Sequence, residues 1–129
     1  MNISTRWADA TQTILYIHFR GQWTLDELYL TIESANRLTA AVTHPYVVIA
    51  DLTNSVSIPA RILSIGNYVE NQPRKADAVY VVGAGHFFNM TLRTFQSQFP
   101  AAVDNLVRCE TVGAAYAQAG KAIAALQQA

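Results

Sequence analysis

The fold of this chain is decided by the segment Tyr46-Val47-Val48-Ile49-Ala50-Asp51-Leu52-Thr53-Asn54-Ser55-Val56-Ser57-Ile58-Pro59. Its first five residues are all apolar, which is typical of a strand covered on both faces in a parallel sheet. Hydroxyl side chains and a proline follow Asp51, and they predict a corner that leads into a helix. Open α/β sheets place ligands at the carboxyl ends of their strands, so this corner is the first candidate for a site.

The rest of the chain predicts further strands on both sides of this segment. A short strand is expected over 5–9, and 13–20 alternates between apolar and polar positions, so the two segments predict an opening hairpin. Valine-rich runs over 76–82 and about 106–110 predict two more strands that lie beside 46–52 in a parallel sheet.

Apolar residues at spacings of three and four predict the helices. The first begins at the capping box Thr24-Leu25-Asp26-Glu27, in which Glu27 reaches back to Thr24, and it stops before Pro45. The second is expected from Ser57 as its cap, with Pro59 in its first turn. In the second helix the apolar positions are Ile58, Ile62, Ile65 and Val69. In the third, which Pro100 ends, they are Phe88, Leu92, Phe95 and Phe99. The last helix, which Thr111 caps, has its apolar positions between Val112 and Leu126.

The predicted order is therefore β-β-α-β-α-β-α-β-α, which indicates an α/β fold. An N-terminal hairpin followed by βα units gives a mostly parallel mixed sheet with helices packed on it. The length of 129 residues suits a single domain over 1–129.

Composition excludes several classes of protein. Hydrophobic residues make up 51% of the chain and charged residues 14%, which favours a packed core over disorder. Nine basic residues balance nine acidic ones, so no charge field indicates a nucleic-acid partner. Cys109 is the single cysteine, the first residues lack the features of a signal peptide, and no apolar run is long enough to span a membrane. A cytoplasmic protein is expected.

Several segments together resemble the STAS domain group, the fold of bacterial anti-sigma-factor antagonists, and in particular its SpoIIAA-like branch. The resemblance covers nearly the whole chain and rests on the opening hairpin, Gly21-Gln22-Trp23-Thr24-Leu25-Asp26-Glu27-Leu28, the run from Val47 to Leu52, Val81-Val82-Gly83, and Val107 to Thr111 leading into Ala114-Ala115-Tyr116. It implies a non-enzymatic regulatory domain that binds a protein partner or forms a homodimer. Anti-sigma-factor antagonists carry a phosphorylated serine in the motif Asp-Ser-x-Gly, whereas this chain has Ile58-Pro59-Ala60-Arg61 there. The phosphoserine switch is therefore not carried over by position.

The candidate binding and regulatory residues lie at two corners. Asp51 either faces a ligand or hydrogen-bonds nearby loop amides. Thr53, Ser55 and Ser57 are alternative phosphorylation sites, unless Ser57 simply caps the helix and Ser55 closes the turn. At the second corner, after Gly83-Ala84-Gly85, His86 stands beside a candidate anion site, and Phe87 with Met90 or Phe99 predicts an apolar surface patch for a partner.

The sequence contains no motif that assembles a catalytic or metal site. The histidines lack ligand spacing, Cys109 lies in an apolar strand, and Phe88 occupies the third glycine position of a dinucleotide fingerprint. We therefore expect no enzyme, no cofactor and no metal, since catalysis would require Asp51, His86 and Cys109 to converge in space. The alternative function is binding of a small apolar ligand or lipid, because STAS-like sheets resemble the CRAL-TRIO fold and the Phe-rich third helix could roof an apolar pocket.

Overall fold

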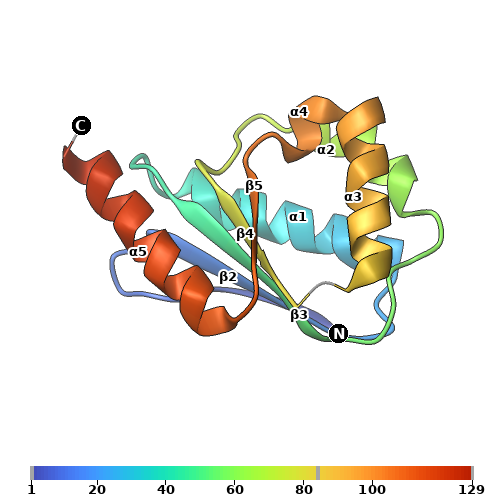
Figure 1. Ribbon diagram of the computed structural model, residues 1–129. Helices are drawn as coiled ribbons and strands as arrows, with labels where there is room; N and C mark the ends of the chain where they lie inside the picture. The colour runs from blue at the N-terminus through green and yellow to red at the C-terminus, as the bar shows by residue number, and fades with distance from the viewer. Residues whose placement is uncertain (1, 84, 129) are drawn as a thin grey trace.

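A mixed sheet of five strands forms the centre of the protein, in the order β1-β2-β3-β4-β5 (Figure 1). The computed structural model describes residues 2–83 and 85–128, without the side chains of His86 and Phe87. The strands are β1 (Ile3–Trp7), β2 (Ile14–Gly21), β3 (Val47–Ser55), β4 (Val79–Val82) and β5 (Leu106–Cys109). β1 and β2 form an antiparallel hairpin, and every later neighbour pair is parallel. The predicted α/β class, hairpin and mostly parallel sheet are confirmed.

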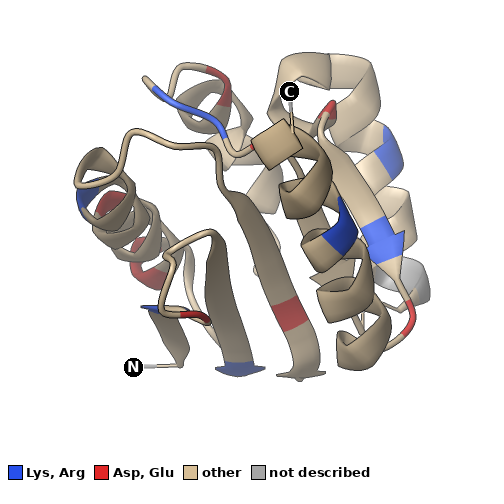
Figure 2. Cartoon of the chain, turned by 90° about the vertical axis from the view of Figure 1, so that its left-hand side faces the viewer, with Lys and Arg blue, Asp and Glu red and all other residues tan. Residues whose placement is uncertain are grey.

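Helices cover both faces of the sheet unequally. On one face lie α1 (Leu25–Ala40), the 3-10 turn η1 (Ile62–Ile65), α2 (Gly66–Glu70), α3 (His86–Gln98) and α4 (Pro100–Val103). Of the described helices, only α5 (Val112–Gln128) packs on the opposite face, where it contacts β3, β4 and β5 (Figures 1 and 2). The two faces therefore have separate cores.

The central strands are buried on both sides, as their unbroken apolar sequence predicts. Along β3, Val47 and Ile49 pack in the core under α5, while Val48 and Leu52 pack with the helices of the other face. Figure 2 shows one acidic segment within the strands, and it corresponds to Asp51 of β3. A carboxylate in this position requires hydrogen-bond partners.

The N-terminus of α1 is capped by the predicted pair Thr24 and Glu27. The Thr24 hydroxyl accepts a hydrogen bond from the Glu27 amide at 3.2 Å, as expected. One oxygen of the Glu27 carboxylate accepts from the backbone N–H of Asn2 at 2.7 Å, so Glu27 fastens the helix to the start of the chain. Glu27 also reaches back to Thr24 as predicted, because its carboxylate accepts a hydrogen bond from the Thr24 hydroxyl at 3.4 Å.

The predicted helix that begins at Ser57 is wrong in its first half. β3 continues to Ser55, since Asn54 and Ser55 pair with Arg20 and Gly21 of β2. Residues 56–61 then form no helix, and helical structure begins only at η1. Ser57 therefore caps no helix.

Close packing joins α2 to the end of α3. Pro100 ends α3 as predicted and also opens α4, where its missing N–H is harmless. A Cβ atom added to Gly66 would lie 2.2 Å from the Phe99 ring. Glycine at the start of α2 thus lets the segment that joins α3 and α4 approach closely.

Candidate functional site

Asp51 is held in a network of hydrogen bonds within the protein. Its side chain is 3% exposed, and it accepts from the Thr53 amide at 3.0 Å, from the Thr53 hydroxyl at 2.6 Å, and from the Tyr16 hydroxyl. Burial alone would raise the pKa of Asp51, but the hydrogen bonds from Thr53 and Tyr16 outweigh it and lower the pKa below its ordinary value. Asp51 thus stays charged and connects β3 to β2 through Tyr16.

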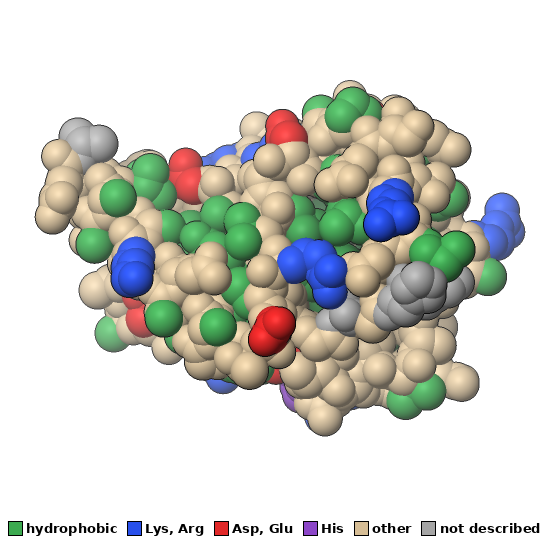
Figure 3. Space-filling view, in the orientation of Figure 1, with side chains coloured by type: hydrophobic (Ala, Val, Ile, Leu, Met, Phe, Trp, Pro, Cys, Tyr) green, Lys and Arg blue, Asp and Glu red, His purple; other side chains and the backbone are tan. Residues whose placement is uncertain are grey.

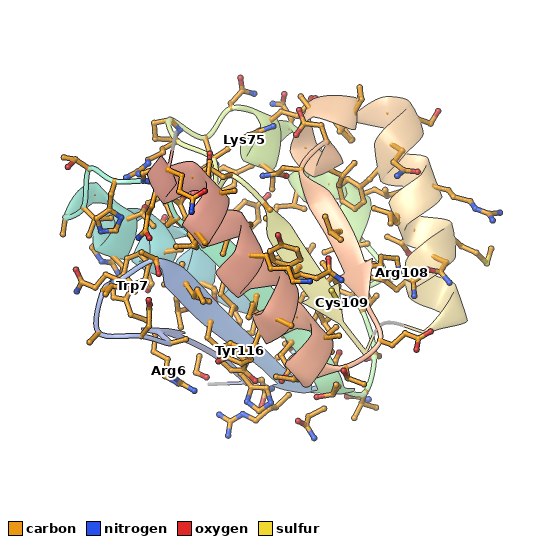
Figure 4. The ribbon with its side chains drawn as sticks, turned by 60° about the vertical axis from the view of Figure 1, so that its left-hand side comes forward. Arg6, Trp7, Lys75, Arg108, Cys109 and Tyr116 are labelled. Atoms are coloured by element: carbon orange, nitrogen blue, oxygen red, sulfur yellow. The ribbon has the colours of Figure 1, made fainter. Side chains whose placement is uncertain are left out.

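Tyr16 links this network to α5, which covers this face of the sheet. Burial, followed by the hydrogen bond to Asp51, raises the pKa of Tyr16 to about 12. The Arg6 guanidinium lies 4.9 Å from the centre of the Tyr16 ring, and Tyr116 of α5 stacks on that ring at 6.2 Å between centroids. Figure 4 shows Arg6 and Tyr116 near one edge of the molecule. These contacts anchor the N-terminal half of α5 beside β2.

The hydroxyl groups after Asp51 have contacts of their own. Thr53 donates to Asp51, while the Ser55 hydroxyl accepts from the Trp23 indole at 2.9 Å and donates to the Ser57 carbonyl at 3.1 Å. Ser55 thus closes a turn over Trp23. Because no helix starts at this corner, a phosphate on Thr53, Ser55 or Ser57 would meet no set of free helical amides there, which removes the physical basis of that prediction.

The corner after β4 is shaped by Gly83. Its φ of +78° and the 2.7 Å separation between an added Cβ and the Thr53 backbone both require glycine. A polar crevice at this end of β4 and β5 is lined by Gly83, Arg108, Cys109 and Glu110. The predicted roles of the His86 and Phe87 side chains concern atoms outside the described residues; nearby Met90 is 54% exposed.

Cys109 is buried beneath α5. Burial raises the pKa of its thiol above the ordinary value of 9.0, so the thiolate that would act as a nucleophile is disfavoured. In the described part of the chain, no group of three or more His, Cys, Asp or Glu residues could hold a metal ion.

An apolar cavity of about 280 Å³ lies between the sheet and α3. This cavity is partly open to the surface of the protein, so a ligand could enter it from outside. The strands supply its floor, which consists of Phe19, Ala50, Leu52, Val79, Val81 and Leu106. These side chains belong to the non-α5 face of the sheet.

The helices supply the roof and walls of the cavity. Phe88, Leu92 and Phe95 of α3 cover it, and Trp23 and Ile62 close it from the side of α1 and η1. Two polar residues, Thr91 and Asn105, also border it, and the Asn105 amide donates to the Ala76 carbonyl at 2.7 Å. The arrangement suits an apolar ligand held by shape and offers little polar recognition inside.

Of the predicted site residues, Asp51, Thr53, Ser55 and Ser57 do not line this cavity, and the side chains of His86 and Phe87 lie outside the described residues. The helical spacing of Phe88, Leu92 and Phe95 marked a buried face, and it supported the prediction of a helix that roofs an apolar pocket. The spacing could not reveal Trp23 or Ile58, because they reach the cavity only through tertiary packing. The sequence thus identified the roof and missed the walls.

Comparisons with protein-family models, with curated proteins and with solved structures each found no match to this chain. A search of the described residues found no helix with both the length and the apolar character that crossing a membrane demands.

Proposed function

We propose that this protein is a non-enzymatic binding domain that holds a small apolar ligand in the cavity beneath α3. The observation that carries the proposal is the cavity of about 280 Å³ with its almost wholly apolar lining. Ligand sites are typically concave, mostly apolar and largely preformed, and their volumes begin near about 300 Å³. The candidate catalytic groups Asp51 and Cys109 have structural roles, since Asp51 is hydrogen-bonded within the protein and Cys109 is buried.

Binding is tested with N-phenyl-1-naphthylamine, a neutral dye whose fluorescence rises in apolar surroundings. The variant Ala50→Leu adds three carbons to the rigid floor of the cavity, and Ala124→Leu makes the same change at an exposed position of α5. We expect the wild-type chain and Ala124→Leu to bind the dye alike, and Ala50→Leu to bind it at least about tenfold more weakly, which corresponds to about 1.4 kcal/mol.

Thermal unfolding separates loss of the cavity from loss of the fold. Filling a void with apolar atoms does not lower stability when the space accommodates them, so Ala50→Leu should melt at or above the wild-type temperature. Absence of dye binding by the wild-type chain would overturn the proposal, and so would equal binding by Ala50→Leu.

The second candidate is a protein-interaction domain similar to anti-sigma-factor antagonists of the STAS group. It is favoured by the opening hairpin followed by parallel strands and by Val56, which is 71% exposed in the loop after β3. In this function the loop would contact a protein partner or a second copy of the chain. Sedimentation equilibrium of wild type and Val56→Asp tests self-association: a dimer that the substitution disrupts supports homodimer formation, and a monomer in both cases excludes it.

A further inference from the structure

We propose that the ligand is an uncharged aromatic compound with a core of about ten carbon atoms, held by the aromatic rings that line the cavity. This inference rests on the proposed function and adds the chemical class of the ligand. Four of the described lining residues are aromatic, namely Phe19, Trp23, Phe88 and Phe95. None of the described lining residues has a charged side chain.

The aromatic rings belong both to the floor and walls of the cavity and to its roof. Phe19 of β2 and Trp23 lie edge to face, with 5.0 Å between their ring centroids and an interplanar angle of 61°. Phe88 and Phe95 are about two helical turns apart on α3, so both rings lie on the covering face of this helix. Aromatic pairs in edge-to-face or offset geometry are more favourable than burial of the same area alone. An aromatic ligand would gain such contacts from the roof as well as from the wall.

Polar groups beside the cavity are engaged within the protein. The Trp23 indole donates to the Ser55 hydroxyl at 2.9 Å, so the ring offers carbon atoms to a ligand and not its N–H. The Asn105 amide donates to the Ala76 carbonyl at 2.7 Å, and Thr91 also has an interaction within the chain. A charged group that entered the cavity would lose its hydration without a charged partner, which costs several kcal/mol or more. The lining therefore favours an uncharged ligand.

Cavity volume sets the size of the ligand. A dry cavity of about 150 Å³ in another protein accommodates benzene, so 280 Å³ corresponds in proportion to about eleven carbon atoms. Naphthalene, with two fused rings, matches this size. Figure 3 shows apolar side chains at the surface between β5 and α3, two elements that contribute Leu106 and Leu92 to the lining. A larger molecule such as N-phenyl-1-naphthylamine can place its naphthyl group inside and extend its phenyl ring toward this surface.

The test compares two-ring compounds that differ in aromatic character or in charge. Naphthalene, decahydronaphthalene and 2-naphthoate are titrated against the full chain at pH 8 by displacement of the dye, below their solubility limits. The affinities of the two hydrocarbons are divided by their partition coefficients between cyclohexane and water, so that the hydrophobic contribution cancels. We expect naphthalene to exceed decahydronaphthalene about fivefold in this corrected affinity, which corresponds to about 1 kcal/mol. Without correction, 2-naphthoate should bind at least about tenfold more weakly than naphthalene.

Ring-removing variants assign the preference to the roof of the cavity. Phe88→Leu and Phe95→Leu each remove one ring but keep an apolar side chain that suits a helix. Each should reduce the corrected preference for naphthalene about twofold. Tyr116→Leu removes a ring from α5 on the opposite face and should leave the preference unchanged. Thermal unfolding checks that each variant is folded at the temperature of the titration.

Three results would overturn this inference while dye binding keeps the proposed function in place. They are equal corrected affinities for naphthalene and decahydronaphthalene, equal binding of naphthalene and 2-naphthoate, and an unchanged preference in both Phe88→Leu and Phe95→Leu. Failure of the dye and of all three compounds to bind would instead overturn the proposed function.

Discussion

Replacement of Gly66 by alanine tests how α3 and α4 are held over the cavity. Gly66 begins α2 with φ −55° and ψ −46°, so its backbone needs no glycine, and alanine alone would favour the helix by up to about 1 kcal/mol. The new Cβ, however, would lie 2.2 Å from Cδ2, 2.5 Å from Cγ and 2.6 Å from Cε2 of Phe99, where carbon atoms prefer about 3.5–4.0 Å. Overpacking of this kind costs about 1–3 kcal/mol, so we expect a net loss of about 1 kcal/mol in the free energy of unfolding.

A double-mutant cycle isolates the contact from other effects. Urea unfolding followed by circular dichroism gives the free energy for wild type, Gly66→Ala, Phe99→Ala and the double variant. With the ring removed, Gly66→Ala should become neutral or stabilising, because the helix propensity of alanine then acts alone. Destabilisation of equal size in both backgrounds would refute the reasoning and show that the ring is not what restricts position 66.

Three further outcomes follow from local contacts. Thr24→Ala should lower the free energy of unfolding by about 1 kcal/mol in urea titrations, while Thr24→Ser should retain most of the stabilisation by the cap. An unchanged free energy of unfolding in Thr24→Ala would show that the cap is dispensable. Asp51→Asn should cost on the order of 2 kcal/mol near neutral pH. The folded-state pKa of Asp51 lies below its ordinary 3.8, so its charged form stabilises the fold above pH 3.8. The difference in free energy of unfolding between wild type and Asp51→Asn should therefore become smaller as the pH falls below 3.8. A difference that grows in acid would contradict this direction. Cys109, buried with a raised pKa, should react with an aromatic disulfide reagent at pH 8 only as the chain unfolds, and immediate labelling in native buffer would exclude this burial.

The strands were predictable because their signal is local. An unbroken apolar run from Val47 to Ala50 has few alternatives to a doubly covered strand, and the structure confirms it. The end of β3 was not predictable, because Ser55 joins the strand by pairing with Gly21, which lies far earlier in the chain. Polar residues in a strand are recognised only when the partner strand is known.

The spacing of Ile58 and Ile62 predicted burial correctly and conformation incorrectly. Both residues pack in the core on the α3 side of the sheet, yet the segment before Ile62 is not helical. A pattern of buried positions reports which side chains face the core, and an irregular segment can satisfy it as well as a helix. The cavity walls depend on this irregular segment, so the sequence could indicate the roof over the cavity without locating the cavity itself.

The hollow beneath α3 gives the folded chain a larger molar volume than a solidly filled interior of the same composition would have. Unfolding removes this hollow, so hydrostatic pressure shifts the folding equilibrium toward the unfolded chain. The opposite face is closely packed, since Ala115 and Ala119 of α5 have no exposed surface and lie directly on the sheet. The two faces of this small sheet therefore differ in how closely they are packed, with a hollow under α3 and close contact under α5.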